Sequence, residues 1–328
     1  MTKDSEKSDW HALYDDRMPT FVRLRSEVEH ILEMVLKDIK IHDIRVRVKK
    51  KESFLEKIER KNYRDPFVEM TDIVGSRVVC LFVDDIKKVE SIIEREFSII
   101  ERNDKLDNLK PETFGYQSVH YLCKFKDGYR GPRYEGLHNL VFEVQLRTIL
   151  QDAWAVVEHT LAYKGRVSTP PDLRRDFSAL AGLLHVADKT FQYIHDRGHD
   201  LEDAAKRDVS ELMNRFNSGG PSATADIGID RNTLKAFLIE QFPDRIQSQA
   251  RLYSAFADEL GEIGVTGISQ LRKLVDKHLD DVLEQEREVN KETKEQRQLS
   301  GLGMLRVITS LEYPGRGVRR VSPPTPSQ

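Results

Sequence analysis

The chain has 328 residues, a length that predicts two domains or one domain with a long extension. Apolar residues make up 39% of it, enough for a packed core, and charged residues make up 33%, which is typical of helices with one face in water. The formal net charge of −3 excludes a general electrostatic nucleic-acid binder. No stretch approaches the roughly 18 apolar residues of a membrane span, and the polar N-terminus has no signal segment.

The two cysteines, Cys80 and Cys123, stand far apart in apolar surroundings, without the close spacing of a zinc site. This placement is typical of buried thiols in a reducing compartment, so we expect no disulfide. Together with the lack of a membrane-spanning or signal segment, it predicts a cytoplasmic protein that does not use a membrane as a partner.

Apolar residues at helical spacing predict a helix over residues 8–40, with a buried stripe of Leu24, Val28, Ile31, Leu32 and Leu36. A strand over 44–51 follows, and Ser53 with Glu56 has the pattern of a reciprocal N-cap that opens a second helix. Further strands are expected at 77–83, 118–125 and 140–147, and further helices at 85–95 and 149–163. This alternation predicts an α/β domain with a mixed sheet flanked by helices.

The second half of the chain has the pattern of an all-α extension. Thr169-Pro170-Pro171 predicts the start of a long helix, whose expected inner stripe consists of Phe177, Leu180, Leu184, Ala187 and Phe191. Residues 217–228 have the composition of a linker, and the end of the chain that of a disordered tail. The expected organisation is an N-terminal segment (1–19), an α/β domain (20–166), a helical extension packed on it (167–216), a linker (217–228), a helical region (229–312) and a tail (313–328).

Three predicted strands carry a chemically rich polar face opposite their apolar one, because side chains alternate along a strand. The polar faces consist of Arg45, Arg47, Lys49 and Lys51 in the first strand, Tyr116, Ser118 and His120 in a later one, and Glu143, Gln145 and Arg147 in the last. Asp72 lies in a loop just before another strand. One such face alone is typical of a sheet that meets water. The set, however, combines cations, two carboxylates, an aromatic ring and a histidine.

That combination suits a nucleotide polyphosphate together with a divalent cation. Lysine and arginine neutralise phosphate oxygens. Asp72 and Glu143 are carboxylates of the kind that hold Mg²⁺ alongside water and phosphate oxygens. A carboxylate beside a hydroxyl can also accept its proton. The residues alone therefore predict a Mg²⁺-dependent phosphoryl-transfer enzyme.

At these residues the chain resembles the synthetase domain of the RelA/SpoT family, which includes the small alarmone synthetases. The resemblance covers about residues 20–165 and rests on five motifs in series: Arg47-x-Lys49-x-x-x-Ser53-x-x-x-Lys57, Asp72-Ile73-Val74-Gly75-Ser76-Arg77, Gly115-Tyr116-Gln117-Ser118-Val119-His120, Glu143-Val144-Gln145-Leu146-Arg147-Thr148, and the segment from Asp152 to His159 followed by Tyr163-Lys164. It implies a nucleotidyltransferase-like fold and a GTP or GDP pyrophosphokinase that moves pyrophosphate from ATP to a guanine nucleotide 3′-hydroxyl, in ppGpp and pppGpp metabolism.

The resemblance also implies a role for each motif residue. Asp72 and Glu143 would be the catalytic pair and would bind Mg²⁺, with Glu143 activating the acceptor hydroxyl, which attacks the β-phosphorus of ATP and expels AMP. The implied ATP-binding residues are Arg47, Lys49, Ser53, Lys57 and Arg77. The implied acceptor-binding residues are Lys110, Tyr116, Ser118, His120, Gln145 and Arg147, with Tyr116 stacked on the base.

The segment before Gly115 departs from the family pattern, which places a lysine and an asparagine where this chain has Glu112 and Phe114. The nearest cation is Lys110. This leaves other acceptors open: the 3′ end of tRNA, as in toxin-type relatives, or an adenosine nucleotide. An inactive nucleotide-binding relative is a further alternative, although no catalytic position is lost. The sequence is also compatible with a homo-oligomer.

Two His-Asp pairs, at 195–196 and 199–200, invite comparison with the HD-type metal hydrolase of long family members. In those proteins the hydrolase domain precedes the synthetase, whereas these pairs follow it and lie at one helix end. We therefore expect a charged, solvated helix terminus and no hydrolase.

Overall fold

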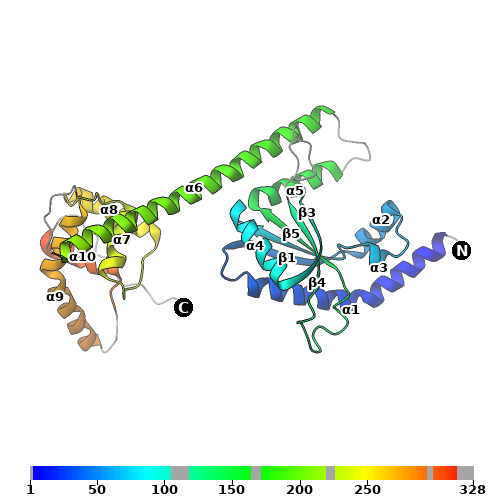
Figure 1. Ribbon diagram of the computed structural model, residues 1–328, viewed down its shortest axis with the longest axis horizontal. Coiled ribbons are helices and arrows are strands. Elements are labelled where there is room, and N and C mark those ends of the chain that lie inside the picture. The colour runs from blue at the N-terminus through cyan, green and yellow to red at the C-terminus, as the bar shows by residue number, and fades with distance from the viewer. Residues whose placement is uncertain (1–2, 105–117, 164–170, 219–225, 294–297, 316–328) are drawn as a thin grey trace. The chain divides into compact units, whose positions relative to one another are not determined.

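The computed structural model describes residues 3–104, 118–163, 171–218, 226–293 and 298–315 (Figure 1). By its internal contacts the chain divides into two compact units, one up to Ile194 and one from His195 onward. Within the described ranges, no helix is both long and apolar enough to cross a membrane.

The first unit is built on a five-stranded mixed sheet, which confirms the expected fold class. Its strands are β1 (Ile41–Val48), β2 (Val74–Cys80), β3 (Phe97–Asp104), β4 (Val119–Phe125) and β5 (Phe142–Thr148), in the spatial order β1-β2-β5-β4-β3. The pair β2–β5 is parallel and the other pairs are antiparallel. The accompanying helices are α1 (Lys3–Val35), α2 (Lys51–Lys61), α3 (Pro66–Glu69), α4 (Val83–Glu96) and α5 (Ile149–Tyr163).

Helix α1 packs against β1 and β2 through the predicted stripe. All five expected residues, Leu24 to Leu36, are at most 2% exposed. The helix runs without a break through residue 19, where the sequence suggested a boundary, and Tyr14 on its first half is also buried. The described residues 3–19 are therefore not a separate segment, because they belong to the helix that continues into the core of the first unit.

The start of α2 corrects the expected capping pattern. The helix begins at Lys51, with Lys50 as an extended N-cap residue that has no side-chain cap, so Ser53 lies inside the first turn. The reason is tertiary: the Lys49 amide donates to the Ile73 carbonyl, and the Tyr14 hydroxyl donates to the Lys49 carbonyl. Because of these bonds the helix begins two residues before Ser53, the start that the local sequence predicted.

Helix α2 is fixed in place by aromatic packing. Phe54 is fully buried, and its ring centroid lies 5.1 Å from the centroids of both Tyr14 and Phe67. Aromatic pairs at this separation contribute beyond their buried area. The packing therefore sets the direction in which the opposite, polar face of α2 presents its side chains.

Helix α6 (Pro171–Asn217) is shared by the two units. The expected inner stripe is wrong at Leu180 and Phe191, which are each 51% exposed. Instead, Ala181 and Asp188 are buried, because the Thr148 hydroxyl at the end of β5 donates to the Asp188 carboxylate over 2.7 Å and turns that face inward.

The second unit is helical in its described parts, as expected for 229–312. Its helices after α6 are α7 (Arg231–Gln241), α8 (Ala250–Glu262), α9 (Ile268–Thr293) and α10 (Gly301–Glu312). They enclose a core of their own, to which α6 contributes Ala205, Val209 and Met213. The extension at 167–216 was expected to pack on the α/β domain, but its helix α6 also packs into the second core. Most of the expected linker and tail, residues 219–225 and 316–328, lies outside the described residues.

A short backbone bridge between Gly228 and Gly267 closes this second core. Beside it, the Asp226 carboxylate accepts hydrogen bonds from the amides of Ile227 and Ser269, at 2.9 Å and 3.0 Å. A side chain at Gly267 would overlap that carboxylate. Glycine is thus required at 267 because Asp226 occupies the space, and not because of an unusual backbone angle.

We predict that Gly267→Ala destabilises the protein by about 1–3 kcal/mol, the usual cost of overfilling a packed site. Thermal or urea unfolding measures the change. The matched control is Gly198→Ala, inside α6, where an added Cβ meets nothing within 4 Å. That substitution should stabilise the protein by up to about 1 kcal/mol, because alanine favours the helix. Equal stabilities of the two variants would contradict the packing argument.

Candidate active site

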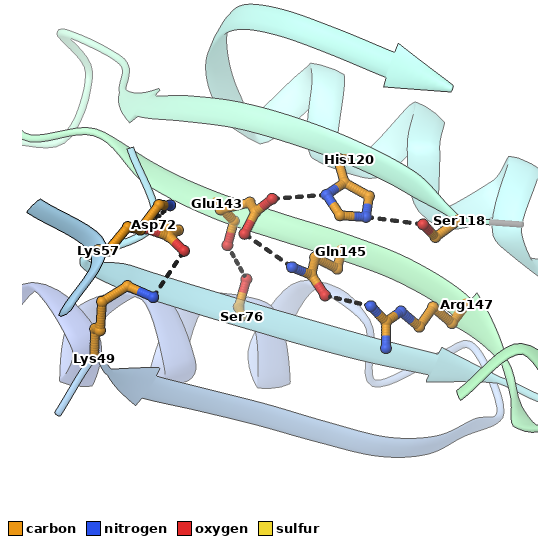
Figure 2. A network of polar contacts seen from close by, with 9 residues as sticks. All are labelled: Lys49, Lys57, Asp72, Ser76, Ser118, His120, Glu143, Gln145 and Arg147. Carbon is orange, nitrogen blue, oxygen red and sulfur yellow. Dashed lines mark hydrogen bonds and ion pairs between the residues drawn. The ribbon is translucent and has the colours of Figure 1, made fainter. Parts of the chain in front are cut away.

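The strand register brings several of the predicted polar residues onto one face of the sheet; Lys49 and Lys51, expected in the first strand, lie after its end at Val48. Because β5 lies between β2 and β4, side chains from three strands form rows across it. One row consists of Arg77, Gln145 and His120, and the neighbouring row contains Arg47, Gly75 and Glu143. Figure 2 shows the central residues of this face together with Asp72 from the loop before β2.

The Asp72 carboxylate is held by two ammonium groups. Lys49, just after β1, lies 2.9 Å from its Oδ2, and Lys57 of α2 lies 2.8 Å from its Oδ1. All three side chains are largely buried, with Asp72 24% exposed. Burial by itself raises the pKa of Asp72, but the hydrogen bonds and charges of Lys57 and Lys49 outweigh it and hold that pKa below its ordinary value.

The Glu143 carboxylate of β5 is held by a second set of donors. His120 Nδ1 lies 2.7 Å from its Oε1, and the Gln145 amide donates to its Oε2 over 2.8 Å. Burial raises the pKa of Glu143, as does the charge of Asp72, but the donors His120 and Gln145 prevail and hold that pKa below its ordinary value. Both carboxylates are therefore ionised at neutral pH.

The two carboxylates influence each other, and the backbone beside Glu143 is open. The pKa of Glu143 responds to the charge of Asp72, so the two groups interact electrostatically. Gly75 stands opposite Glu143 on β2, and a Cβ there would meet nothing within 4 Å. The sheet thus leaves room beside Glu143 for a ligand to lie close to the backbone of Gly75.

A chain of polar contacts continues from Glu143 along the sheet. His120 Nε2 lies 2.8 Å from the Ser118 hydroxyl, and Arg147 donates to the Gln145 carbonyl oxygen over 2.8 Å. Since a carboxylate has no proton to give, His120 Nδ1 carries the proton toward Glu143. Figure 2 shows these side chains following one another across β4 and β5.

Asp152, in the first turn of α5, is a site-supporting residue to which sequence reasoning assigned no role. Its Oδ1 accepts from Arg77 over 2.8 Å and from Arg147 over 3.1 Å. Asp152 opens the fifth motif of the resemblance, but that motif gives it no individual role. Only the strand pairing, which brings Arg77 beside β5, could have identified it.

The remaining predicted residues are less enclosed or lie outside the described residues. Arg47 on β1 and Ser53 on α2 are exposed, with Arg47 on the same face as Glu143. Lys110 and Tyr116, predicted to bind the acceptor, lie outside the described residues, so their roles stay predictions. His195 and His199 lie one turn apart on α6 with 3.2 Å between their Nε2 atoms.

The donor chemistry of Asp72 and Glu143 fits a magnesium ion. Both are hard oxygen ligands, and both are ionised for the reasons given above. Mg²⁺ is commonly held by one or two carboxylates, with water and substrate phosphates completing its shell. Among the described residues, no group of three or more histidine, cysteine or acidic side chains could hold a metal alone.

We predict that Asp72→Asn lowers the free energy of unfolding of the ligand-free protein by about 1–2 kcal/mol at pH 7, because two neighbouring ammonium groups lose their counter-charge. Urea denaturation measures the change. The folded pKa of Asp72 lies below 3.8, so the wild-type advantage is present above that value and disappears as pH falls through the folded pKa.

The control for this experiment is Asp84→Asn, which removes an acidic residue from an exposed pair with Lys87 on α4. Exposed pairs contribute little, so its stability should remain near that of the wild type. If Asp72→Asn is as stable as this control at pH 7, the pairs of Asp72 with Lys49 and Lys57 do not contribute to the stability of the folded protein.

Part of this chain is similar in sequence to known proteins. Residues 46–168 match the family model described as the region found in RelA/SpoT proteins. The chain is 33% identical to the GTP pyrophosphokinase YjbM of Bacillus subtilis over 131 residues, 39% of this chain and 59% of that protein. It is 29% identical to the GTP pyrophosphokinase YwaC of the same organism over 155 residues, 45% of this chain and 71% of that protein.

Solved structures give weaker likenesses. Small alarmone synthetase 1 from Bacillus subtilis is 25% identical with a TM-score of 0.48, covering 58% of this chain and 98% of that one. A GTP pyrophosphokinase family protein from Streptococcus pneumoniae is 26% identical with a TM-score of 0.47, covering 61% and 97%. These scores are too low to argue from. The match to the family model, which contains Asp72 and Glu143, shows that residues 46–168 are a region of the kind found in RelA/SpoT proteins.

Proposed function

We propose that this chain transfers pyrophosphate from ATP to the 3′-hydroxyl of a guanine nucleotide, either GTP or GDP. The observation that carries the proposal is the pair of ionised carboxylates, Asp72 in the loop before β2 beside two lysines and Glu143 on β5 beside a histidine. The domain's family supports it, and so do the names of the two Bacillus relatives. The chain spans 59% of YjbM's length.

The ATP side of the site is the basic edge formed by β1 and α2. Lys49 and Lys57 hold Asp72 before the substrate arrives, and their ammonium groups are within reach of any phosphate that approaches that carboxylate. Arg47, exposed on the same face, adds a planar donor suited to phosphate oxygens. The exposed Ser53 adds a hydroxyl near the start of α2.

Asp72 and Glu143 would hold Mg²⁺ together with the ATP phosphates. When bound, the ion neutralises charge that develops on the phosphate oxygens. Asp72 would contribute its oxygens to the metal, and Lys49 and Lys57, which pair with Asp72 in the ligand-free protein, would contribute their ammonium groups to phosphate. The pairs in the ligand-free protein thus keep the lysines stretched toward the place where they act.

The acceptor side is the row of β4 and β5. Glu143 accepts the proton of the nucleotide 3′-hydroxyl at a carboxylate oxygen, while His120 and Gln145 hold that carboxylate in place. Ser118 in turn holds the His120 ring. Phosphoryl transfer asks little covalent chemistry of the protein, so positioning and charge neutralisation supply most of the rate.

A guanine acceptor is favoured over tRNA or an adenosine nucleotide. Both curated relatives are GTP pyrophosphokinases, and the chain's net charge of −3 provides no overall attraction for RNA. The residues that would read the base, Lys110 and Tyr116, lie outside the described residues. An assay that offers each acceptor separately therefore tests the choice of a guanine nucleotide.

We predict that label from γ-³²P ATP appears in a small guanosine product when GTP or GDP is supplied with Mg²⁺. Thin-layer chromatography separates this product from ATP. The same reaction is run with ATP alone and with bulk tRNA, each without a guanine nucleotide. Label in tRNA would establish the toxin-type activity instead, and label in an adenosine product would establish an adenosine alarmone. Either result would replace the guanine acceptor.

We predict that Glu143→Gln lowers the transfer rate by about 10²–10⁴-fold, the usual contribution of a general base together with its charge. Binding of ATP without Mg²⁺, measured by calorimetry, should stay close to that of the wild type, because Lys49 and Lys57 are unchanged. The matched control is Glu259→Gln in the second unit, a glutamate of similar exposure (17% against 15%) paired with Arg306. If Glu143→Gln retains the turnover of the wild type, Glu143 is not the general base.

A further inference from the structure

Arg147, expected from the family resemblance to bind the acceptor, is turned toward the protein instead. Its side chain is 7% exposed at the end of β5. One guanidinium nitrogen donates to the Gln145 side-chain oxygen over 2.8 Å, and another donates to Asp152 over 3.1 Å. A side chain this enclosed, with both contacts directed at protein groups, has little surface left for a nucleotide.

The contact with Arg147 sets which end of the Gln145 amide faces Glu143. A guanidinium only donates hydrogen bonds, so it selects the amide oxygen. The amide nitrogen is then directed the other way, where it donates to Glu143 Oε2 over 2.8 Å. The reversed amide would place its oxygen against the carboxylate and its nitrogen against the guanidinium, two contacts that cannot form hydrogen bonds.

Asp152 holds Arg147 in the position that this selection requires. It is 13% exposed and accepts from both Arg147 and Arg77, so one carboxylate of α5 anchors an arginine on each of two neighbouring strands. Figure 2 shows Arg147 at the end of the series that leads through Gln145 to Glu143. Helix α5 thereby supports β5, the strand that carries Glu143.

We propose that Arg147 is a positioning residue, which acts through the orientation of the Gln145 amide on Glu143 and is itself anchored by Asp152. This assignment rests on the proposed function, since Glu143 is the group that it serves. It differs from a direct ligand contact in one testable respect: it operates in the ligand-free protein.

The first test is the side-chain amide of Gln145 in ¹⁵N-resolved NMR spectra of the full-length, ligand-free protein. The signal is assigned by its loss in Gln145→Ala. In Arg147→Met the amide protons should move toward the values of a free glutamine, and Arg147→Lys should move them less. The matched control is Arg306→Met, which removes an arginine of similar exposure (11%) from its pair with Glu259 in the second unit and should leave the signal unchanged.

The second test is kinetic. Arg147→Met should lower kcat by about 10- to 100-fold, the scale of a small misplacement in an active site, with the KM values for ATP and acceptor little changed. Asp152→Asn should reduce kcat in the same direction, and Arg147→Lys should restore part of it. The double variant Arg147→Met/Gln145→Ala should be no slower than Gln145→Ala alone, because both act through one amide.

The outcomes separate the inference from the proposed function. A wild-type protein that transfers no pyrophosphate would overturn the function, while the NMR test of the amide still stands. An unmoved Gln145 signal in Arg147→Met would overturn the inference, even in an active enzyme. A raised KM for the acceptor with an unmoved signal would return Arg147 to direct ligand binding.

Discussion

The parallel pairing of β2 with β5 is the constraint on which the site depends. It sets Gly75 opposite Glu143 and Arg77 opposite Gln145, so that an open space and a carboxylate stand side by side. A slip of one residue would turn Glu143 toward the apolar face and Val144 toward the ligand. Val144 and Leu146, which are fully buried, resist such a slip. The hydrophobic core thus determines where the charges stand.

Given that register, the site has to keep two half-buried carboxylates ionised close to each other. Each is stabilised by its own donors, lysines for Asp72 and a histidine with an amide for Glu143. The difference matches the two ends of the proposed reaction. The flexible ammonium groups of the lysines can move with a phosphate group. The His120 ring and the Gln145 amide are held on strands, so they keep Glu143 in one orientation.

Alternation along the strands was sufficient to predict that Glu143, Gln145 and His120 share a polar face, but not that β1 ends before Lys49 and Lys51. Periodicity was sufficient for the buried stripe of α1. Strand β3 was missed because its second half, Glu101 to Asp104, is polar and follows a register shift after Ile99. The start of α2 and the role of Asp152 depend on contacts between segments far apart in the chain, from Tyr14 and Ile73 in one case and Arg77 in the other. Local patterns cannot contain that information.

The division of α6 between two units has a consequence for how such a chain can evolve. Ala205, Val209 and Met213 belong to the C-terminal core, yet they precede the glycine-rich segment that looks like a natural junction in the sequence. Recombination at that segment would separate these side chains from the helices they pack against. A new partner for the synthetase domain would have to be acquired upstream of residue 205, within the helix itself, or else bring a surface that accepts the same three residues.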